Sequence, residues 1–408
     1  MKMRFLILNL FIMNVSYGAY YDTLPKGVRL AAFRYVKTGE VNSSYGSNRQ
    51  ESSYFLKQNF DAKTLHSLNS ATEVYFDELK RISEKAYNDF TFGEYEGSGS
   101  ANVQVNGYGL GYGLTNRVTL YASVPYYKAD VKFNLIRNKG NNHSSVAKEI
   151  YESEASEVSN LLSQLTKELP DAKESLLQSI AVNYYGYKPI GDWKGEGFGD
   201  AEVGMIYRLT NWQTAGLAAT LGAILPTGRI DDPDILQDIA FGDGQTDLFF
   251  EFGGGVKIFN EKADLSLSGR YTHQFESTKE LRIPEDDEYP LSDKKGIFKE
   301  KLGNKIDITG HFAIELFSWL SPYSSYTYSQ KEKSKYTSQY ELANEYLAKN
   351  SDTETHTLKF GLNISTVKLY QTGKFMAPVM LDLSMQSVVE GQNTPKYDRV
   401  DLELRLFF

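Results

Sequence analysis

Titratable residues of both signs recur at alternate positions in several strand-like stretches of the chain. Side chains of a β-strand point alternately to its two faces, so residues two apart share a face. Asp247 and Glu251, for example, oppose Leu248 and Phe250. Charges spread along a strand face in this way are typical of a polar surface with ion pairs. They are less typical of an active site, whose side chains lie close together. The positions with this pattern are Glu202, Arg208, Asp247, Glu251, Lys257, Arg270, Asp307, His311, Glu315, Lys359, Asp382, Arg399, Asp401, Glu403 and Arg405.

The residues that could support hydrolysis are few. His273 and Ser277 share a strand face with Tyr271 and Phe275. A serine nucleophile needs a histidine within hydrogen-bond reach, and residues four apart on a strand are separated by roughly 13 Å. Metal-ligand spacing is also absent from the other histidines, which are His66, His143, His311 and His356. We therefore expect no catalytic, cofactor or metal site, with a hydrolase on the lipid face as the less favoured alternative.

Two acidic runs fall in stretches that read as loops. One contains Asp231, Asp232 and Asp234, and the other covers residues 285–288. Clustered carboxylates bind Ca²⁺ or bridge to lipopolysaccharide in some proteins, and in many others they are simply hydrated loop residues. We expect hydrated loop residues, with Ca²⁺ binding or a bridge to lipopolysaccharide as the less favoured alternative.

The last stretch of the chain indicates what element positions the alternating charges. In 397–408 the charged residues alternate with an apolar set that ends on the terminal Phe. This stretch resembles the C-terminal signal of bacterial outer-membrane barrels, which the barrel-assembly machinery reads. An edge strand of a soluble sandwich is the alternative. The apolar set is Val400, Leu402, Leu404, Leu406 and Phe408.

The first residues have the pattern of an export signal. Lys2 and Arg4 precede a mostly apolar run over 5–15, which is too short to span a bilayer as a helix. Small residues follow at Ser16 and Gly18, so we expect a signal peptide over 1–18 and a mature chain over 19–408. The predicted location is the outer membrane of a Gram-negative cell, where outer-membrane lipid and lipopolysaccharide are the expected partners.

Composition narrows the class of protein further. The chain has 408 residues, no cysteine, 29 tyrosines, 33 glycines and a net charge of −8. Its mean hydropathy is −0.42. The acidic balance disfavours nucleic-acid binding, and low hydropathy disfavours a helical membrane protein. A transmembrane barrel is compatible with it, because only alternate residues face lipid.

Strand-like stretches and loop lengths together predict an all-β, up-and-down antiparallel transmembrane barrel of about 12 strands. The connections alternate between short and long, as expected when short turns face the periplasm and long loops face outward. Closure is required because an open sheet edge in lipid leaves backbone groups unpaired. The predicted strands cover about 27–36, 101–112, 118–127, 201–209, 217–226, 247–258, 265–275, 306–316, 323–336, 358–364, 379–386 and 397–408.

Two insertions in the predicted outer loops have helical rather than strand periodicity. Apolar residues recur at helical spacing over about 61–88 and again over about 143–183, where Pro170 divides the pattern. Each apolar stripe needs a surface to pack on. We expect the two insertions to pack on one another, over or inside the outer mouth of the barrel.

Several Gly-rich phrases resemble a bacterial outer-membrane family named for the MetA pathway of phenol degradation, whose members are loosely labelled transporters. The resemblance implies a barrel and passage of small, often hydrophobic compounds, without specifying a substrate. The helical insertions depart from the compact pattern of that family. The phrases cover residues 112–117, 123–126, 197–204 (with Asp200), 225–228 and 242–247.

The expected function is therefore a porin-like channel or transporter. The charged faces would line a lumen for passive passage of small solutes, among them hydrophobic or aromatic ones. An ion-pair network that fills the barrel is an equal interpretation of the same residues, since 12 strands lie between packed and open barrels. The alternative function is structural or adhesive, acting through the helical loops.

Overall fold

The computed structural model describes residues 20–66, 70–143, 145–146, 178–285 and 292–408. The predicted signal peptide over 1–18, and most of the helical insertion predicted over 143–183, lie outside the described residues. The chain divides into two compact units. The smaller unit contains 54–99 and 132–192, and the larger unit contains the remaining described residues.

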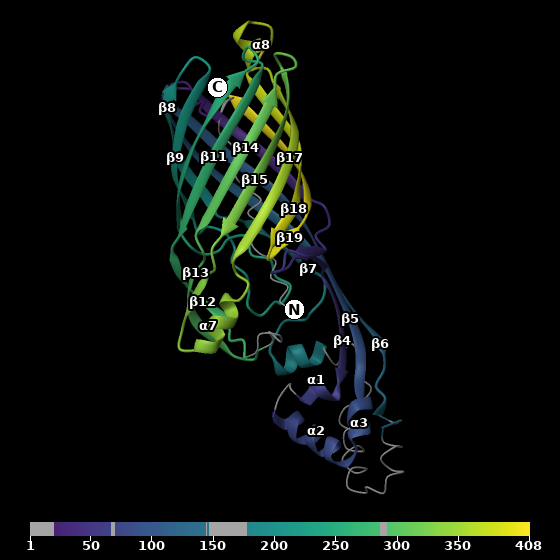
Figure 1. The fold of residues 1–408 in the computed structure, drawn as a ribbon. Coiled ribbons are helices and arrows are strands. Elements are labelled where there is room, and N and C mark those ends of the chain that lie inside the picture. Colours follow the sequence, from purple (N-terminus) through teal and green to yellow (C-terminus); the bar gives the residue numbers. More distant parts are fainter. Residues whose placement is uncertain (1–19, 67–69, 144, 147–177, 286–291) are drawn as a thin grey trace. The chain divides into compact units, whose positions relative to one another are not determined.

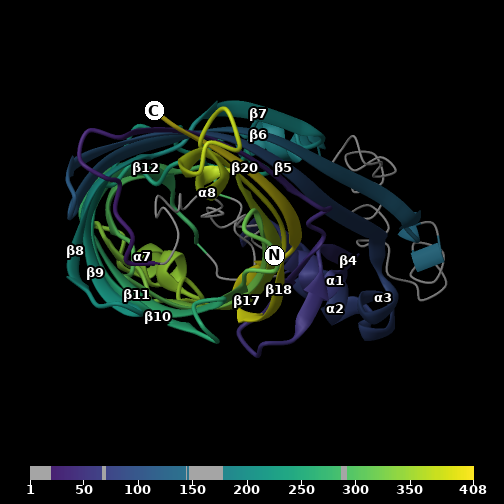
Figure 2. The ribbon, with the colours of Figure 1, turned by 90° about the horizontal axis from the view of Figure 1, so that it is seen from above.

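The larger unit is a closed antiparallel barrel of 12 strands, as the sequence predicts (Figures 1 and 2). Neighbouring strands pair around the ring, and pairing of β5 with β6 completes it. The first and last strands also pair, since Arg29 and Phe408 exchange backbone hydrogen bonds. In ring order the strands are β1 (Arg29–Thr38), β20 (Asp398–Phe407), β18 (Val379–Gln392), β17 (Thr353–Ser365), β15 (Leu320–Lys331), β14 (Lys305–Ile314), β11 (Ala263–Gln274), β10 (Asp247–Ile258), β9 (Ala215–Leu225), β8 (Ala201–Asn211), β6 (Val118–Lys139) and β5 (Thr91–Thr115).

Burial in the ring is the reverse of that in a soluble sheet. Along β20, Asp401 and Glu403 are 4% and 6% exposed, whereas Val400 is 50% exposed. Leu248, Phe250 and many other large apolar side chains are likewise exposed on the strands. Charged side chains therefore point into the barrel and apolar ones point outward, as a lipid environment requires.

Some aromatic rings on the inner wall lie over a glycine of the neighbouring strand. Tyr121 pairs in register with Gly204, and Phe249 pairs with Gly222. A Cβ added at Gly222 would lie 2.3 Å from Cζ of Phe249 and 2.5 Å from the backbone oxygen of Val203. The absence of a side chain at these positions is therefore what makes room for the rings.

Changing Gly222 to Ala is expected to destabilise the barrel by about 1–3 kcal/mol, the usual cost of overpacking a well-packed interior. Gly310 is a matched control, because a Cβ added there meets no atom within 4 Å. The measurement is the urea midpoint of unfolding in lipid vesicles. Equal midpoints for G222A and G310A would show that packing of the Phe249 ring does not require a glycine at position 222.

Smaller elements extend the larger unit at both ends. One end carries the short turns, α8 (Val367–Gln371) and the C-terminus, and the other carries α7 (Glu341–Ala348) (Figure 1). At that second end, α7 packs through Ala343 and Leu347 on a small sheet that presents Phe298. The small sheets contain β12 (Glu276–Arg282), β13 (Lys295–Lys301) and β16 (Lys335–Thr337), and separately β19 (Thr394–Lys396), β2 (Ser43–Tyr45) and β3 (Glu51–Ser53). β7 (Trp193–Phe198) pairs with β6 beyond β8.

The smaller unit has a hydrophobic core of its own. Phe76, Leu79, Ala86, Phe90 and Val146 are buried together in it. The helical prediction over 61–88 is confirmed, and Val146 shows that the second insertion contributes to the same core. The elements are β4 (Phe55–Asp61), α1 (Ala62–His66), α2 (Ser70–Ile82), α3 (Glu84–Asp89), a single π-helical turn over Ile180–Tyr184, and the ends of β5 and β6.

No described helix combines the length and the apolar character needed to cross a membrane.

Candidate functional site: the barrel interior

All fifteen residues predicted to line a lumen are withdrawn from solvent to some degree. Eight are buried and seven are half-buried. The buried ones are Glu202, Asp247, Arg270, Asp307, Arg399, Asp401, Glu403 and Arg405. The half-buried ones are Arg208, Glu251, Lys257, His311, Glu315, Lys359 and Asp382.

One ion-pair network is centred on Asp401 of the last strand. Its Oδ2 lies 3.2 Å from a guanidinium nitrogen of Arg34, 3.4 Å from Nε of Arg399 and 3.9 Å from Nζ of Lys359. Next to it, Nε of Arg405 donates to Oε1 of Glu403 at 2.6 Å. The cations come from three strands, β1, β17 and β20, so this network braces the closing seam of the barrel from inside.

A second network joins strands that are not neighbours. Arg270 of β11 lies 2.8 Å from Glu202 of β8, across the two intervening strands. Tyr121 donates to the same carboxylate at 2.7 Å. The guanidinium of Arg270 stacks over the Phe249 ring, with its central carbon 3.5 Å from the ring centroid. Cation–π contact and ion pairing together fix the orientation of Arg270.

The remaining predicted positions are distributed around the wall and its ends. Asp307 accepts from Ser329 and pairs with Lys305. The ring of His311 lies 5.2 Å from the ring of Tyr323. Arg208 and Glu315 lie at the short-turn end, where Arg208 donates to a backbone oxygen of the turn after β5 and Glu315 pairs with Lys368 of α8. The structure thus groups the predicted residues into several clusters rather than one site.

The segment before β1 lies inside the barrel at the short-turn end. Tyr21 and Leu24 are 3% and 0% exposed, and they pack in one cluster with inward residues such as Phe249 and Met380. Tyr20 donates to Glu251 at 2.8 Å. The backbone N–H of Leu24 donates to Oγ1 of Thr119 at 2.8 Å. This apolar cluster fills the interior next to the charged networks.

Three of the Gly-rich phrases meet at a single junction. Oδ1 of Asp200 accepts from the N–H of Gly228 at 2.8 Å, and its Oδ2 accepts from the N–H of Asp243 at 3.1 Å. Oγ1 of Thr227 donates to the backbone oxygen of Gly199 at 3.0 Å. A Cβ at Gly228 would lie 2.9 Å from Oδ1 of Asp200. The phrases therefore hold the 226–246 loop to the start of β8.

Burial raises the pKa of Asp243, in that loop, to about 6. The hydrogen bond from the N–H of Gln245 opposes the shift, and the nearby Asp200 carboxylate adds to it. A carboxyl group whose pKa is raised on folding favours the folded state when it is protonated. Its stabilising contribution is therefore complete below its unfolded pKa of about 3.8 and is lost as pH rises through about 6.

The 226–246 loop is accordingly expected to be held more tightly at pH 4 than at pH 8, by about 3 kcal/mol for a shift of this size. Asp243→Asn keeps an oxygen to accept from Gln245 and removes the titration. Limited proteolysis at the two pH values, with each rate divided by cleavage of an unstructured peptide, measures the effect. A wild-type pH dependence no larger than that of D243N would refute it.

Other residues considered from the sequence have ordinary surroundings. The ring of His273 packs edge-on against the ring of Phe275 at 4.8 Å. Ser277 lies in β12, outside the barrel ring. In the acidic runs, Asp234 pairs with Arg282 and Lys295, and Glu285 pairs with Lys294. Residues 286–288 lie outside the described part of the chain.

Comparison with known proteins bears on the fold of the chain. No family model matches the chain, and no curated protein matches it. Among solved structures it is similar to the COG4313 outer membrane channel from Pseudomonas putida F1, at 14% identity and a TM-score of 0.52 over 95% of this chain and 98% of that one. This likeness supports the barrel fold.

Two further structures align over most of the chain. The toluene transporter TbuX of Ralstonia pickettii aligns with 94% of this chain and 90% of that one, at 9% identity and a TM-score of 0.35. A FadL homologue of Pseudomonas aeruginosa aligns with 95% and 92%, at 8% identity and a TM-score of 0.34.

The sequence did not reveal several residues that shape the interior. Arg34 was obscured because the buried face of β1 otherwise carries apolar residues such as Leu30 and Val36. In the structure Arg34 lies opposite Glu403 of the last strand, a register that the sequence does not specify. Tyr21 and Leu24 carried no signal, because they precede any regular periodicity.

Proposed function

We propose that the chain is an outer-membrane channel for passive passage of small solutes, hydrophobic or aromatic ones among them. The observation that carries the proposal is the reversed burial of the closed ring, with charged groups inside and large apolar side chains outside. An ion-pair network such as that around Asp401 also keeps polar groups along the wall instead of a dry apolar core.

The interior offers two kinds of surface to a solute. Tyr323 presents a half-buried ring on the inner wall, whereas the rings of Tyr121 and Phe249 are covered by the protein itself. The half-buried Asp382 lies beside Tyr323, whose hydroxyl donates to it at 2.6 Å. Stacking on rings and hydrogen bonding to fixed charges together suit small aromatic compounds with a polar substituent. The P. putida protein similar in fold is itself described as a channel.

A liposome swelling assay tests this proposal. Protein extracted in mild detergent should run faster on SDS gels before heating than after, since a closed sheet resists SDS, and it should fractionate with the outer membrane. In liposomes it should admit small aromatic acids faster than sugars of similar mass. A heat-shifted barrel that admits neither class would refute the channel.

A structural or adhesive role is the second candidate. It is favoured by the smaller unit, whose core of residues such as Phe76 and Leu79 makes it a folded module in its own right. The swelling assay separates the two roles, because a scaffold needs the barrel only as an anchor.

A further inference from the structure

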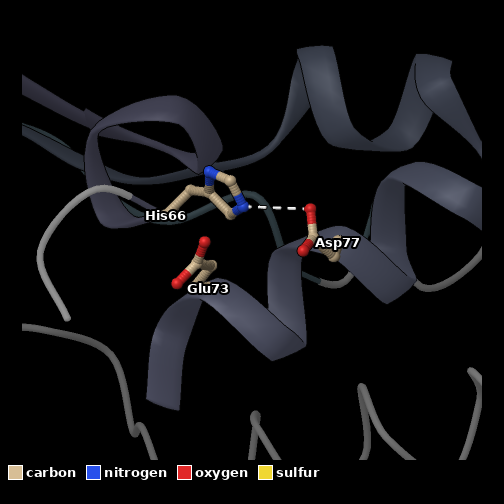
Figure 3. Close-up of side chains that lie close together, drawn as sticks. All are labelled: His66, Glu73 and Asp77. Carbon is tan, nitrogen blue, oxygen red and sulfur yellow. Dashed lines mark hydrogen bonds and ion pairs between the residues drawn. The ribbon is translucent and has the colours of Figure 1, made fainter. Parts of the chain in front are cut away.

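Three potential metal ligands converge in the smaller unit. His66 is the last residue of α1, and Glu73 and Asp77 stand four apart on α2. One ligand atom from each lies within 4.8 Å of the others. Figure 3 shows the imidazole of His66 directed toward the two carboxylates.

The packing of the helices holds these side chains in place. Residues four apart on a helix share one face, so Glu73 and Asp77 point to the same side. Phe76 and Leu79 of α2 face the core at 3% and 1% exposed. The ring of His66 meets the ring of Tyr87 of α3 edge-on at 6.3 Å. The buried face of α2 therefore fixes the helix that carries the two exposed carboxylates, and the half-buried contact with Tyr87 orients His66.

The group combines one imidazole with two carboxylates. Nε2 of His66 lies 3.1 Å from Oδ1 of Asp77. Within the described residues, neither Glu73 nor Asp77 is paired with a lysine or arginine. Two carboxylates this close repel one another unless a cation lies between them. An imidazole with two carboxylates is a nitrogen and oxygen set that suits first-row divalent metals.

We propose that His66, Glu73 and Asp77 form a binding site for a divalent transition-metal ion such as Zn²⁺. The ion takes one bond from each side chain and completes its coordination with water. It thereby ties the end of α1 to α2 and stabilises the helical part of the smaller unit. A simple hydrogen bond between His66 and Asp77 is the competing interpretation, and it predicts no metal affinity.

Calorimetric titration with ZnCl₂ tests the site on the full chain, without an affinity tag and after chelator treatment. We expect a single equivalent of Zn²⁺ to bind. Loss of a ligand in H66A or D77N should weaken binding at least about tenfold, since even outer-shell changes cost that much at metal sites. Glu78→Gln is the matched control, because Glu78 lies on α2 and pairs with Arg81 outside the group.

Hydrogen exchange provides a readout independent of affinity. Zn²⁺ should slow exchange in peptides covering α1 and α2 of the wild type and of E78Q, and leave exchange in H66A unchanged. Comparing exchange in the α3 peptide shows whether each variant keeps its fold. Absence of Zn²⁺ binding by the wild type, or equal binding by wild type and H66A, would overturn the proposal.

Discussion

Changing Leu404 to Asp is expected to prevent most of the protein from assembling into a barrel. Leu404 lies on the outward face of β20, in register with Phe33 of β1 and Leu381 of β18. A charge on the lipid face near the midplane costs on the order of 2–4 kcal/mol for Arg or Lys, and somewhat less for Asp. The cost falls on the strand that closes the ring, where pairing must be completed before the sheet is stable in lipid.

The heat-shifted fraction of protein in outer-membrane extracts measures this effect. Leu404→Met is the volume-conserving control. Glu403→Gln tests the inward face, because the amide keeps an oxygen to accept from Arg405. We expect both controls to assemble. An equal loss of heat-shifted protein in L404D and E403Q would contradict the assignment of the inward and outward faces of the last strand.

Replacing Tyr21 and Leu24 with Ser is expected to speed the entry of solutes severalfold. Both side chains are buried in the apolar cluster at the short-turn end of the barrel. Removing a buried leucine side chain typically costs about 2–5 kcal/mol. The double variant should therefore release the 20–24 segment from the interior while leaving the strands paired.

Liposome swelling rates measure the change, with Lys26→Gln as the control because Lys26 is exposed beside the same segment. Mass spectrometry of the mature N-terminus must show the same cleavage site in all three proteins. A double variant that assembles normally and swells liposomes at the wild-type rate would show that this segment does not restrict the path.

The strands were predictable because a membrane barrel enforces alternation on both faces. Each of the 12 predicted stretches overlaps a ring strand. Among the parts that the sequence did not predict are the ends of β5 and β6 over 91–99 and 132–139, which belong to the smaller unit. There β5 pairs with β4 and carries buried residues such as Phe92 and Tyr95, so the lipid pattern does not apply.

The strand predicted over 323–336 starts too late, since β15 begins at Leu320. Pro322 lies within that strand, opposite Leu362. The sequence favoured a turn because proline cannot donate to a sheet.

The sequence predicted which charged residues face the interior. It did not predict which of them pair with one another. Alternation identified Asp401 and Arg270, but their partners depend on which strands meet and on reach across the barrel. Arg270 crosses two strands to reach Glu202. The junction around Asp200 likewise depends on three loops that are distant in sequence.

Single-channel recording in a planar bilayer tests the central claim most directly. If the barrel is a channel, tag-free, heat-shifted protein should give stepwise currents. We also expect a shift toward cation selectivity in Lys359→Glu, whose side chain lies inside the barrel beside Asp401. Lys299→Glu, on the exposed part of β13, should leave selectivity unchanged. Folded protein that inserts without conducting, or K359E and K299E with the same selectivity, would contradict the central claim.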